Sequence, residues 1–300
     1  MPTSTPGSDW TESTVSQSSQ LRDIWARYRR NKLAMVGLVV VVILVVTAVV
    51  GDYLTPYNAF EQNLLNTTAP PSADHWLGTD VLGRDMFSEL VYGVRLAMIV
   101  AVSTVALSLV LGVALGALAG YRGRVTDTVL MRITDIFLAF PVLVGAIVVV
   151  RAAGQGVWPV IVALALFSWP VSARLMRGQV LALREAEYVE AARSIGARGR
   201  RIVVRHILPN AIAPVLVYAF TSIGVVVVGL ASLSYLGIGV PPDVPEWGRL
   251  ISQSAPFLRV PGKTHLWLYP AIAICITTLG FALVADGLRD SLDPKLRGEG

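Results

Sequence analysis

Long apolar runs separated by short polar segments dominate the chain. Windows without charged residues cover 33–51, 96–121, 152–173, 207–242 and 266–285, and a shorter one, 136–150, reaches spanning length if it is extended back to Met131 past Asp135. About 20 apolar residues cross a bilayer core as a helix, whereas a soluble α/β core shows runs of about four to eight. The pattern therefore predicts six membrane helices, at about 33–51, 96–121, 131–151, 155–174, 211–238 and 266–286.

Composition supports an all-α integral membrane protein. Hydrophobic residues make up 54% of the chain and charged residues 15%, compared with about a quarter charged in soluble domains. The one cysteine, Cys275, excludes a disulfide framework within the chain. Residues 1–20 are rich in Ser and Thr and have no basic segment typical of a signal peptide, so we expect them to be disordered.

The basic residues predict the orientation. If the N-terminus is cytoplasmic, most of the 25 Lys and Arg residues lie in cytoplasmic segments: the N-terminal tail, the segment after the second span, the loop after the fourth span and the C-terminal tail. The positive-inside rule selects this arrangement. It predicts a multi-pass membrane protein with a cytoplasmic tail at 1–32, a membrane domain at 33–286 and a second cytoplasmic tail at 287–300.

Small residues and prolines predict details of helix packing. Gly112, Gly116 and Gly120 form a ridge at intervals of four, on which another helix can pack closely. Each of three further residues removes an intrahelical hydrogen bond and predicts a kink or a helix start: Pro141, Pro170 and Pro214.

No catalytic, cofactor or metal site is predicted. Gly262–Thr264 resembles the end of a phosphate-binding loop, but Phe257 occupies the position of the required glycine. The three histidines are scattered and no paired cysteines accompany them. We therefore expect a non-enzymatic protein, and any ATP that it uses must be hydrolysed by another chain.

Two acidic residues lie near predicted membrane boundaries. Asp135 follows Arg132 by three residues, and Arg289 follows Asp286 by three, so each pair can interact along a helix. Two interpretations stay open at this point: interfacial ion pairs, or residues that line the inner mouth of a pathway.

The stretch Glu190–Pro209, within a loop at 186–209, combines arginines with a small-residue helix. Residues 186–197 favour a helix, Gly196 and Gly199 favour a stop or turn, and 200–208 predict a basic amphipathic helix before Pro209. A solvated basic loop does not explain the Glu-Ala-Ala patch, and a nucleic-acid patch lacks interleaved aromatic residues, so no nucleic-acid partner is expected. A protruding elbow that docks a partner explains the whole stretch.

This loop resembles the Glu-Ala-Ala motif of permease subunits in ATP-binding-cassette (ABC) importers, and the matching positions are Glu190, Ala191, Ala192, Arg193, Gly196, Leu208 and Pro209. His206 stands where the family usually has an apolar residue. Three further segments resemble the dipeptide/oligopeptide/nickel branch: His75–Arg95, Leu233–Gly248 and Asp286–Gly298. Leu230 replaces an acid that many oligopeptide-type members carry, which favours a dipeptide permease of the C-subunit type. Residues 1–20 lie outside the resemblance.

The resemblance implies a type I ABC importer permease fold with a cytoplasmic coupling helix at 190–196. It implies import of dipeptides or short oligopeptides, with ATP and Mg bound by partner subunits and no cofactor in this chain. The implied partners are a second homologous permease, two ABC ATPases, an extracytoplasmic substrate-binding protein and the bilayer of the bacterial plasma (inner) membrane. The alternatives are a same-family importer of nickel, haem or glutathione, or an ion-coupled secondary transporter.

Overall fold

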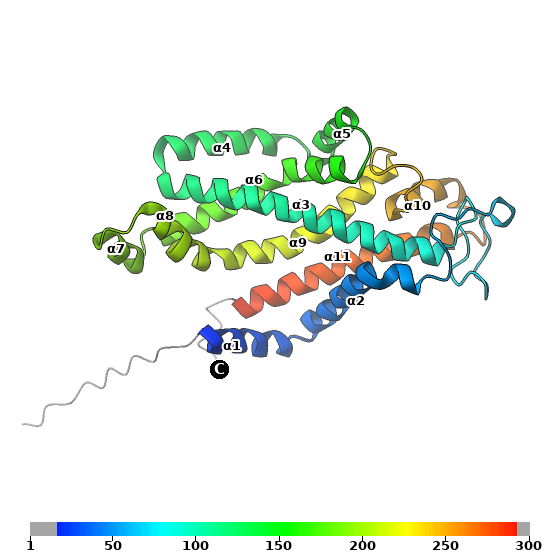
Figure 1. Ribbon diagram of the computed structural model, residues 1–300, viewed down its shortest axis with the longest axis horizontal. Helices are drawn as coiled ribbons and strands as arrows, with labels where there is room; N and C mark the ends of the chain where they lie inside the picture. The colour runs from blue at the N-terminus through cyan, green and yellow to red at the C-terminus, as the bar shows by residue number, and fades with distance from the viewer. Residues whose placement is uncertain (1–16, 293–300) are drawn as a thin grey trace, which may run out of the picture.

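A computed structural model describes residues 17–292, which form a bundle of long helices without a β-strand in that range (Figure 1). The helices are α1 (Gln17–Arg30), α2 (Lys32–Leu54), η1 (Leu64–Asn66), α3 (Met86–Arg122), α4 (Arg124–Ala139), α5 (Val142–Ala153), α6 (Val157–Leu183), α7 (Glu187–Ser194), α8 (Gly199–Ile202), the π-helical η2 (Val203–Ile207), α9 (Leu208–Tyr235), α10 (Trp247–Ser254), η3 (Ala255–Phe257) and α11 (His265–Leu292).

Within the described residues, five helical stretches are long and apolar enough to cross a membrane, and the bent pair α4–α5 makes a sixth candidate span. The predicted number of spans is therefore matched if that pair counts as one. The helices extend beyond the charge-free windows. In α3, for example, the carboxylate of Asp85 accepts a hydrogen bond from the backbone N–H of Ser88 at 2.9 Å and caps the helix ten residues before the predicted start at Leu96.

The prediction of one helix over 131–151 is wrong. The chain bends by 87° between α4 and α5. The reason is Pro141, because a proline disfavours the helical conformation of the residue before it. Phe140 is extended, with φ −88° and ψ 130°, and α5 starts again directly after Pro141. Pro170 and Pro214, in contrast, lie inside continuous helices.

Two predicted boundaries near the chain ends also need correction. The predicted disordered stretch 1–20 lies mostly outside the described residues, but 17–20 belong to α1. The sixth span, predicted to end at 286, continues to Leu292, because no proline or glycine pair interrupts the helix after Asp286. The rest of the predicted C-terminal tail, 293–300, lies outside the described residues.

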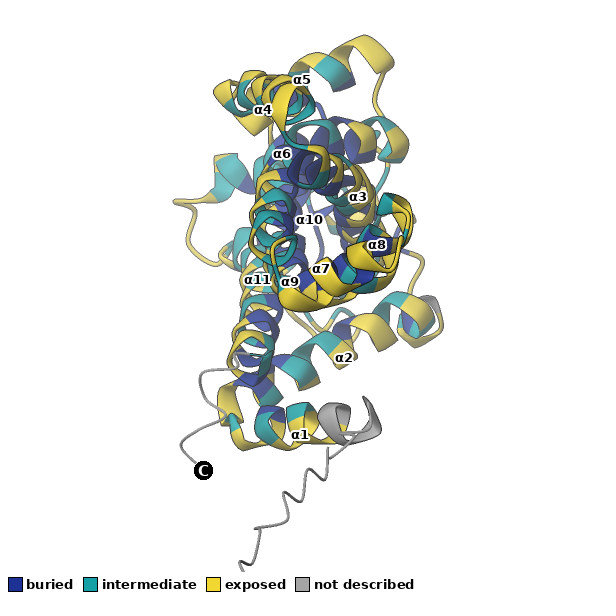
Figure 2. Cartoon of the chain, turned by 90° about the vertical axis from the view of Figure 1, so that its left-hand side faces the viewer, coloured by how far each residue is buried: buried dark blue, intermediate teal, exposed yellow. Residues whose placement is uncertain are grey.

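Close contact between α3 and α6 forms the centre of the bundle, as the glycine ridge predicts. A Cβ atom on Gly116 would lie 2.3 Å from the carbonyl oxygen of Ala173, and one on Gly120 would lie 2.9 Å from Cβ of Val180. Glycines also allow α2 and α11 to approach, since a Cβ on Gly287 would lie 2.2 Å from Cβ of Ala34. Buried residues concentrate along these central helices and leave the outer faces exposed (Figure 2).

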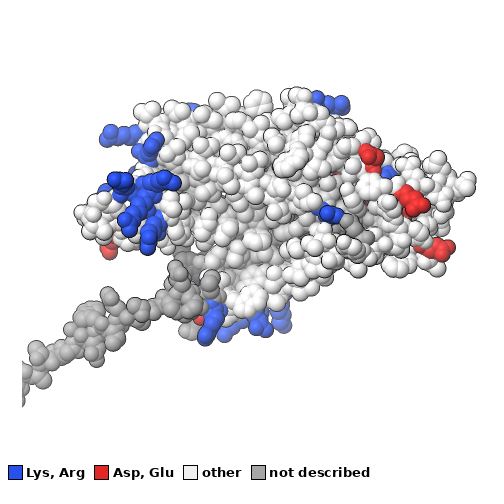
Figure 3. Space-filling view, in the orientation of Figure 1, with Lys and Arg blue, Asp and Glu red and all other residues white. Residues whose placement is uncertain are grey.

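The two ends of the bundle differ in structure and charge. We call the end formed by α7 and α8 the α7 end, and the end formed by residues 55–85 and α10 the α10 end (Figure 1). The described chain begins and ends toward the α7 end. Lys and Arg side chains gather at the α7 end, whereas acidic side chains are visible on the α10 end (Figure 3).

Candidate functional site

The predicted elbow is present at the α7 end, and one face of α7 is firmly attached to the bundle. Val189 is fully buried and Ala192 is 6% exposed. Both belong to a hydrophobic cluster that includes Met176 and Val180 of α6 and Ile207 before α9. Because these apolar contacts join α7 to two long helices, a displacement of α7 is expected to move α6 and α9 with it.

The opposite face of α7 is exposed and has no partner within the described residues. It carries Glu190, Ala191 and Arg193, three of the residues that the motif singles out. Two apolar side chains lie beside them, Tyr188 with 42% exposure and Ile195 with 86%. Sequence reasoning missed these two, because an apolar residue next to a buried helix face reads as part of the core. Exposed apolar residues among charges are typical of a protein-docking surface.

Gly196 ends α7 in a Schellman motif. Its φ is +80°, its N–H donates to the carbonyl of Arg193 at 3.0 Å, and the N–H of Ala197 donates to the carbonyl of Ala192 at 3.1 Å. This left-handed conformation favours glycine, and the motif satisfies carbonyls at the helix end. The helix stop that the sequence predicted at Gly196 is confirmed, and it turns the exposed tip of the elbow back toward α8.

The second part of the elbow is continuous with α9, which corrects the expectation of a separate helix before Pro209. Leu208 donates its N–H to the carbonyl of Val203, five residues earlier, in the π-helical segment η2. This wider turn accommodates Pro209, whose ring would otherwise crowd the preceding turn. Ile202 and Ile207 are buried, Leu208 is half-buried and Pro209 is exposed.

Ion pairs connect α4 to α6 near the elbow. Arg177 contacts both carboxylate oxygens of Asp127, with Nε–Oδ1 at 2.5 Å and Nη2–Oδ2 at 2.6 Å, and Arg174 lies 2.6 Å from Asp135. The predicted Arg132–Asp135 pair is confirmed, but at 3.7 Å it is the longer of the two contacts of Asp135. Sequence spacing along one helix could not reveal the stronger partner on α6.

Among the described residues no ion pair joins Asp286 and Arg289, which are both exposed, so a role for these two side chains stays a prediction. The neighbouring Asp290 instead accepts a hydrogen bond from the side-chain amide of Asn31, at 3.1 Å, which ties α11 to the start of α2. Arg289 lines a hollow together with Pro214 and Tyr218. Both side chains are exposed, where water stabilises a charge without a partner.

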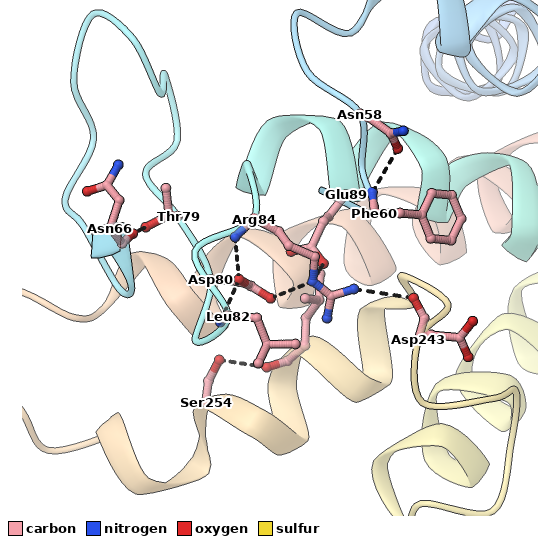
Figure 4. A network of polar contacts seen from close by, with 11 residues as sticks. Asn58, Phe60, Asn66, Thr79, Asp80, Leu82, Arg84, Glu89, Asp243 and Ser254 are labelled. Carbon is pink, nitrogen blue, oxygen red and sulfur yellow. Dashed lines mark hydrogen bonds and ion pairs between the residues drawn. The ribbon is translucent and has the colours of Figure 1, made fainter. Parts of the chain in front are cut away.

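A buried charge cluster at the α10 end, which sequence reasoning did not single out, holds residues 55–85 to the bundle (Figure 4). Arg84 is 1% exposed; its Nε lies 3.1 Å from Asp80 Oδ2 and 3.1 Å from Glu89 Oε1, and its Nη1 donates to the carbonyl of Asp243. Asp80 also accepts backbone N–H groups of Leu82 and Arg84. Buried charges are tolerated only when they are paired in this way.

Helix α10 is anchored next to this cluster. The carboxylate of Glu246 caps the helix by accepting the N–H of Arg249 at 3.1 Å, and the indole of Trp247 donates to the carbonyl of Leu90 at 3.1 Å. Burial raises the pKa of the Glu246 carboxyl, and the N–H groups of Gly248 and Arg249 oppose that shift. The α10 end is therefore a rigid platform, whereas the α7 end presents an exposed docking surface.

The described residues contain no group of three or more His, Cys, Asp and Glu side chains that could hold a metal ion. His75 Nδ1 lies 2.9 Å from Asp85 Oδ1 at the start of α3. That contact fixes the loop in front of α3.

Comparison with known proteins identifies the family of the chain. Residues 112–298 match the family described as binding-protein-dependent transport system inner membrane component, and 19–71 match the N-terminal membrane domain of oligopeptide transport permease C. The chain belongs to this family of transport permeases. Residues 112–298 include the whole elbow and five of the six candidate spans in full or in part, and 19–71 include the remaining span.

Relatives of the permease cover nearly its full length. It is 41% identical to the oligopeptide transport system permease protein of Bacillus subtilis over 92% of this chain and 90% of the relative. It is 39% identical to a dipeptide transport system permease of Alkalihalophilus pseudofirmus (97% and 95%) and 40% identical to a glutathione transport system permease of Pectobacterium atrosepticum (92% and 91%). The resemblance to ABC importer permeases is confirmed, and this permease is a multi-pass membrane protein.

Proposed function

We propose that this permease forms part of the pathway of an ABC importer for dipeptides or short oligopeptides and transmits ATP-driven movement through its elbow. The observation that carries the proposal is the division of α7 into a buried face, with Val189 and Ala192, and an exposed face, with Glu190, Ala191 and Ile195. A surface that is open to a partner and fixed to two membrane helices suits a coupling element.

The α7 end is proposed to face the cytoplasm. Lys and Arg side chains gather there (Figure 3), as expected from the positive-inside rule. In this orientation α7 points toward ATPase subunits, and both chain ends lie in the cytoplasm. The α10 platform then faces the extracytoplasmic side, where a substrate-binding protein would deliver its cargo.

The proposed complex contains a second homologous permease and two ABC ATPases that bind ATP and Mg. Closure of the ATPases would push α7, and the cluster around Val189 would transfer the movement to α6 and α9. The Arg177–Asp127 and Arg174–Asp135 pairs would carry α4 with α6. Such rigid-body coupling can switch a pathway between inward-facing and outward-facing states.

Glutathione is the second candidate substrate, because permeases named for its transport are as similar to this chain as those named for peptides. Both classes of cargo are short peptides, so the choice rests with the binding protein. Competition between a labelled dipeptide and unlabelled glutathione for uptake would separate them.

An ion-coupled transport mechanism is disfavoured because Asp127 and Asp135 are both paired with arginines. Uptake that survives ATP depletion would support such a mechanism.

Substitution of the exposed elbow is expected to abolish coupled transport. Glu190→Gln removes the one acid of the Glu-Ala-Ala patch; if it pairs with a cation of the ATPase, the loss is about 2 kcal/mol or more, which is about thirtyfold in affinity. Gly196→Ala forces a side chain into the left-handed region at a cost of about 1 kcal/mol. We expect the double variant to insert normally and to lose peptide uptake and substrate-stimulated ATPase activity, measured in reconstituted vesicles.

Two matched controls are available at the α10 end, and because uptake also depends on that end, they are compared with the elbow variant by binding of the ATPase subunits. Gly262 has a φ of +78° and, like Gly196, open space where a Cβ atom would lie, so Gly262→Ala carries the same backbone cost away from the elbow. Glu61→Gln removes an equally exposed acid. Full uptake and stimulated ATPase activity in the Glu190→Gln/Gly196→Ala variant would refute the coupling role.

A further inference from the structure

An apolar groove runs along the outside of the bundle between α3 and the second part of the elbow. Its volume is about 630 Å³, and its walls include Val110, Ala114 and Leu118 of α3 and Val203 and Leu208 of the elbow. The lining is almost entirely aliphatic over two turns of α3. A groove of this kind on a membrane-spanning helix accepts a hydrocarbon chain.

Two arginines stand at the end of this groove nearest the α7 end. Arg122 is the last residue of α3 and Arg200 lies in α8, so the two guanidinium groups come from opposite walls. Both side chains are exposed, and neither has an ion-pair partner among the described residues. They belong to the concentration of basic side chains at this end (Figure 3). Unpaired cations at the boundary of an apolar groove attract an anion that is joined to hydrocarbon.

The wall formed by the elbow touches α3 directly at this point. A Cβ atom on Gly199 would lie 2.9 Å from the Tyr121 ring, so α8 packs closely on the last turn of α3. The elbow and α3 therefore meet next to Arg122 and Arg200. Any molecule that fills the groove and contacts both Arg122 and Arg200 would link the membrane helix to the elbow.

We propose that this groove is a binding site for an anionic diacyl phospholipid, with one acyl chain between α3 and η2 and the phosphate between Arg122 and Arg200. Clusters of Lys and Arg beside transmembrane helices recognise anionic headgroups, and basic pockets between helices bind them specifically. The elongated apolar groove fits an acyl chain, and the two arginines match the negative charge of the headgroup. A bound lipid would hold the elbow against α3, so anionic lipid would favour the seated position of α8.

Lipid binding to the full-length chain tests this proposal without any need for transport. The chain is extracted in mild detergent, supplied with equal amounts of phosphatidylglycerol and phosphatidylcholine, and the retained lipids are counted by native mass spectrometry. We expect a preference for phosphatidylglycerol that falls by about fivefold for each arginine replaced in Arg122→Gln and Arg200→Gln. Arg29→Gln, an exposed arginine of α1 away from the groove, is the matched control and should leave the preference unchanged.

A variant that fills the groove distinguishes a lipid occupant from a protein occupant. Ala114→Trp places a large ring on an exposed position of the groove and should remove the retained phosphatidylglycerol, as the double arginine variant does. Equal retention of the two lipids by the unmodified chain would overturn the proposal, as would a preference that survives loss of both arginines. Loss of a co-purifying protein from Ala114→Trp with an unchanged lipid count would assign the groove to a helix of that protein and would also overturn it.

Discussion

Arg84→Gln is expected to lower the free energy of unfolding by about 3–5 kcal/mol, because removal of one partner from a buried ionic cluster leaves the others uncompensated. Asp80 is 2% exposed and Glu89 is fully buried, so neither carboxylate can turn to water after the guanidinium is lost. The carbonyl of Asp243 also loses its donor. Thermal unfolding of the purified chain in detergent, followed by tryptophan fluorescence, measures the effect.

Two further variants show whether the loss comes from buried charge. Arg259→Gln replaces an exposed arginine at the same end and should change stability by less than about 0.5 kcal/mol. Glu89→Gln added to Arg84→Gln removes one of the unpaired charges and should recover part of the loss. An Arg84→Gln chain as stable as Arg259→Gln would show that the cluster does not hold residues 55–85 in place.

The helices and the elbow were predictable from local sequence because their signals lie within a few residues. Charge-free runs near bilayer length located the spans, and the glycine ridge of Gly112, Gly116 and Gly120 identified the face of α3 that packs on α6. The spacing from Glu190 to Gly196 predicted a helix with a glycine stop, which the Schellman motif at Gly196 confirms. In each case one periodicity or one turn residue decides the structure.

Long-range contacts were not predictable in the same way. Asp80 and Arg84 lie in His75–Arg95, one of the segments that carry the resemblance, but no local signal indicates that Arg84 donates to the carbonyl of Asp243, far along the chain. Arg132 was the partner expected for Asp135 within one helix, whereas Arg174 on α6 makes the shorter contact. Pro141 predicted a kink or a helix start, but the sequence does not give the 87° angle of the bend.

The exposure of Ile195 illustrates the same limit at the functional surface. An apolar side chain within a mixed segment can face the core or a partner, and only the placement of Val189 and Ala192 decides between them. Once those two residues are buried against α6, helical geometry leaves Glu190 and Ala191 outward. Ile195 is exposed at the C-cap, directly after the last residue of the helix. The docking surface therefore follows from packing on the opposite face of α7.

Gly116→Ala is expected to destabilise the bundle by about 1–3 kcal/mol, and Gly116→Leu to prevent recovery of folded protein, because both overpack the closest helix contact. The added Cβ would lie 2.3 Å from the Ala173 carbonyl oxygen and 3.0 Å from Met176 Cβ, and backbone cannot move aside as a flexible side chain can. The two helices must separate instead. Because α6 carries the elbow, we also expect Gly116→Ala to reduce uptake by more than the loss of folded protein explains.

At a second glycine of the same helix pair, substitution by alanine is expected to change stability in the opposite direction, which makes the test specific. Gly178 lies in α6 with no atom within 4 Å of an added Cβ, so Gly178→Ala introduces a better helix former at no steric cost. It should stabilise the chain by about 0.5–1 kcal/mol. Thermal unfolding of the two alanine variants beside the unmodified chain gives the comparison. If Gly116→Ala raised the unfolding temperature as Gly178→Ala does, close α3–α6 packing would not be what holds the elbow-bearing helix in position.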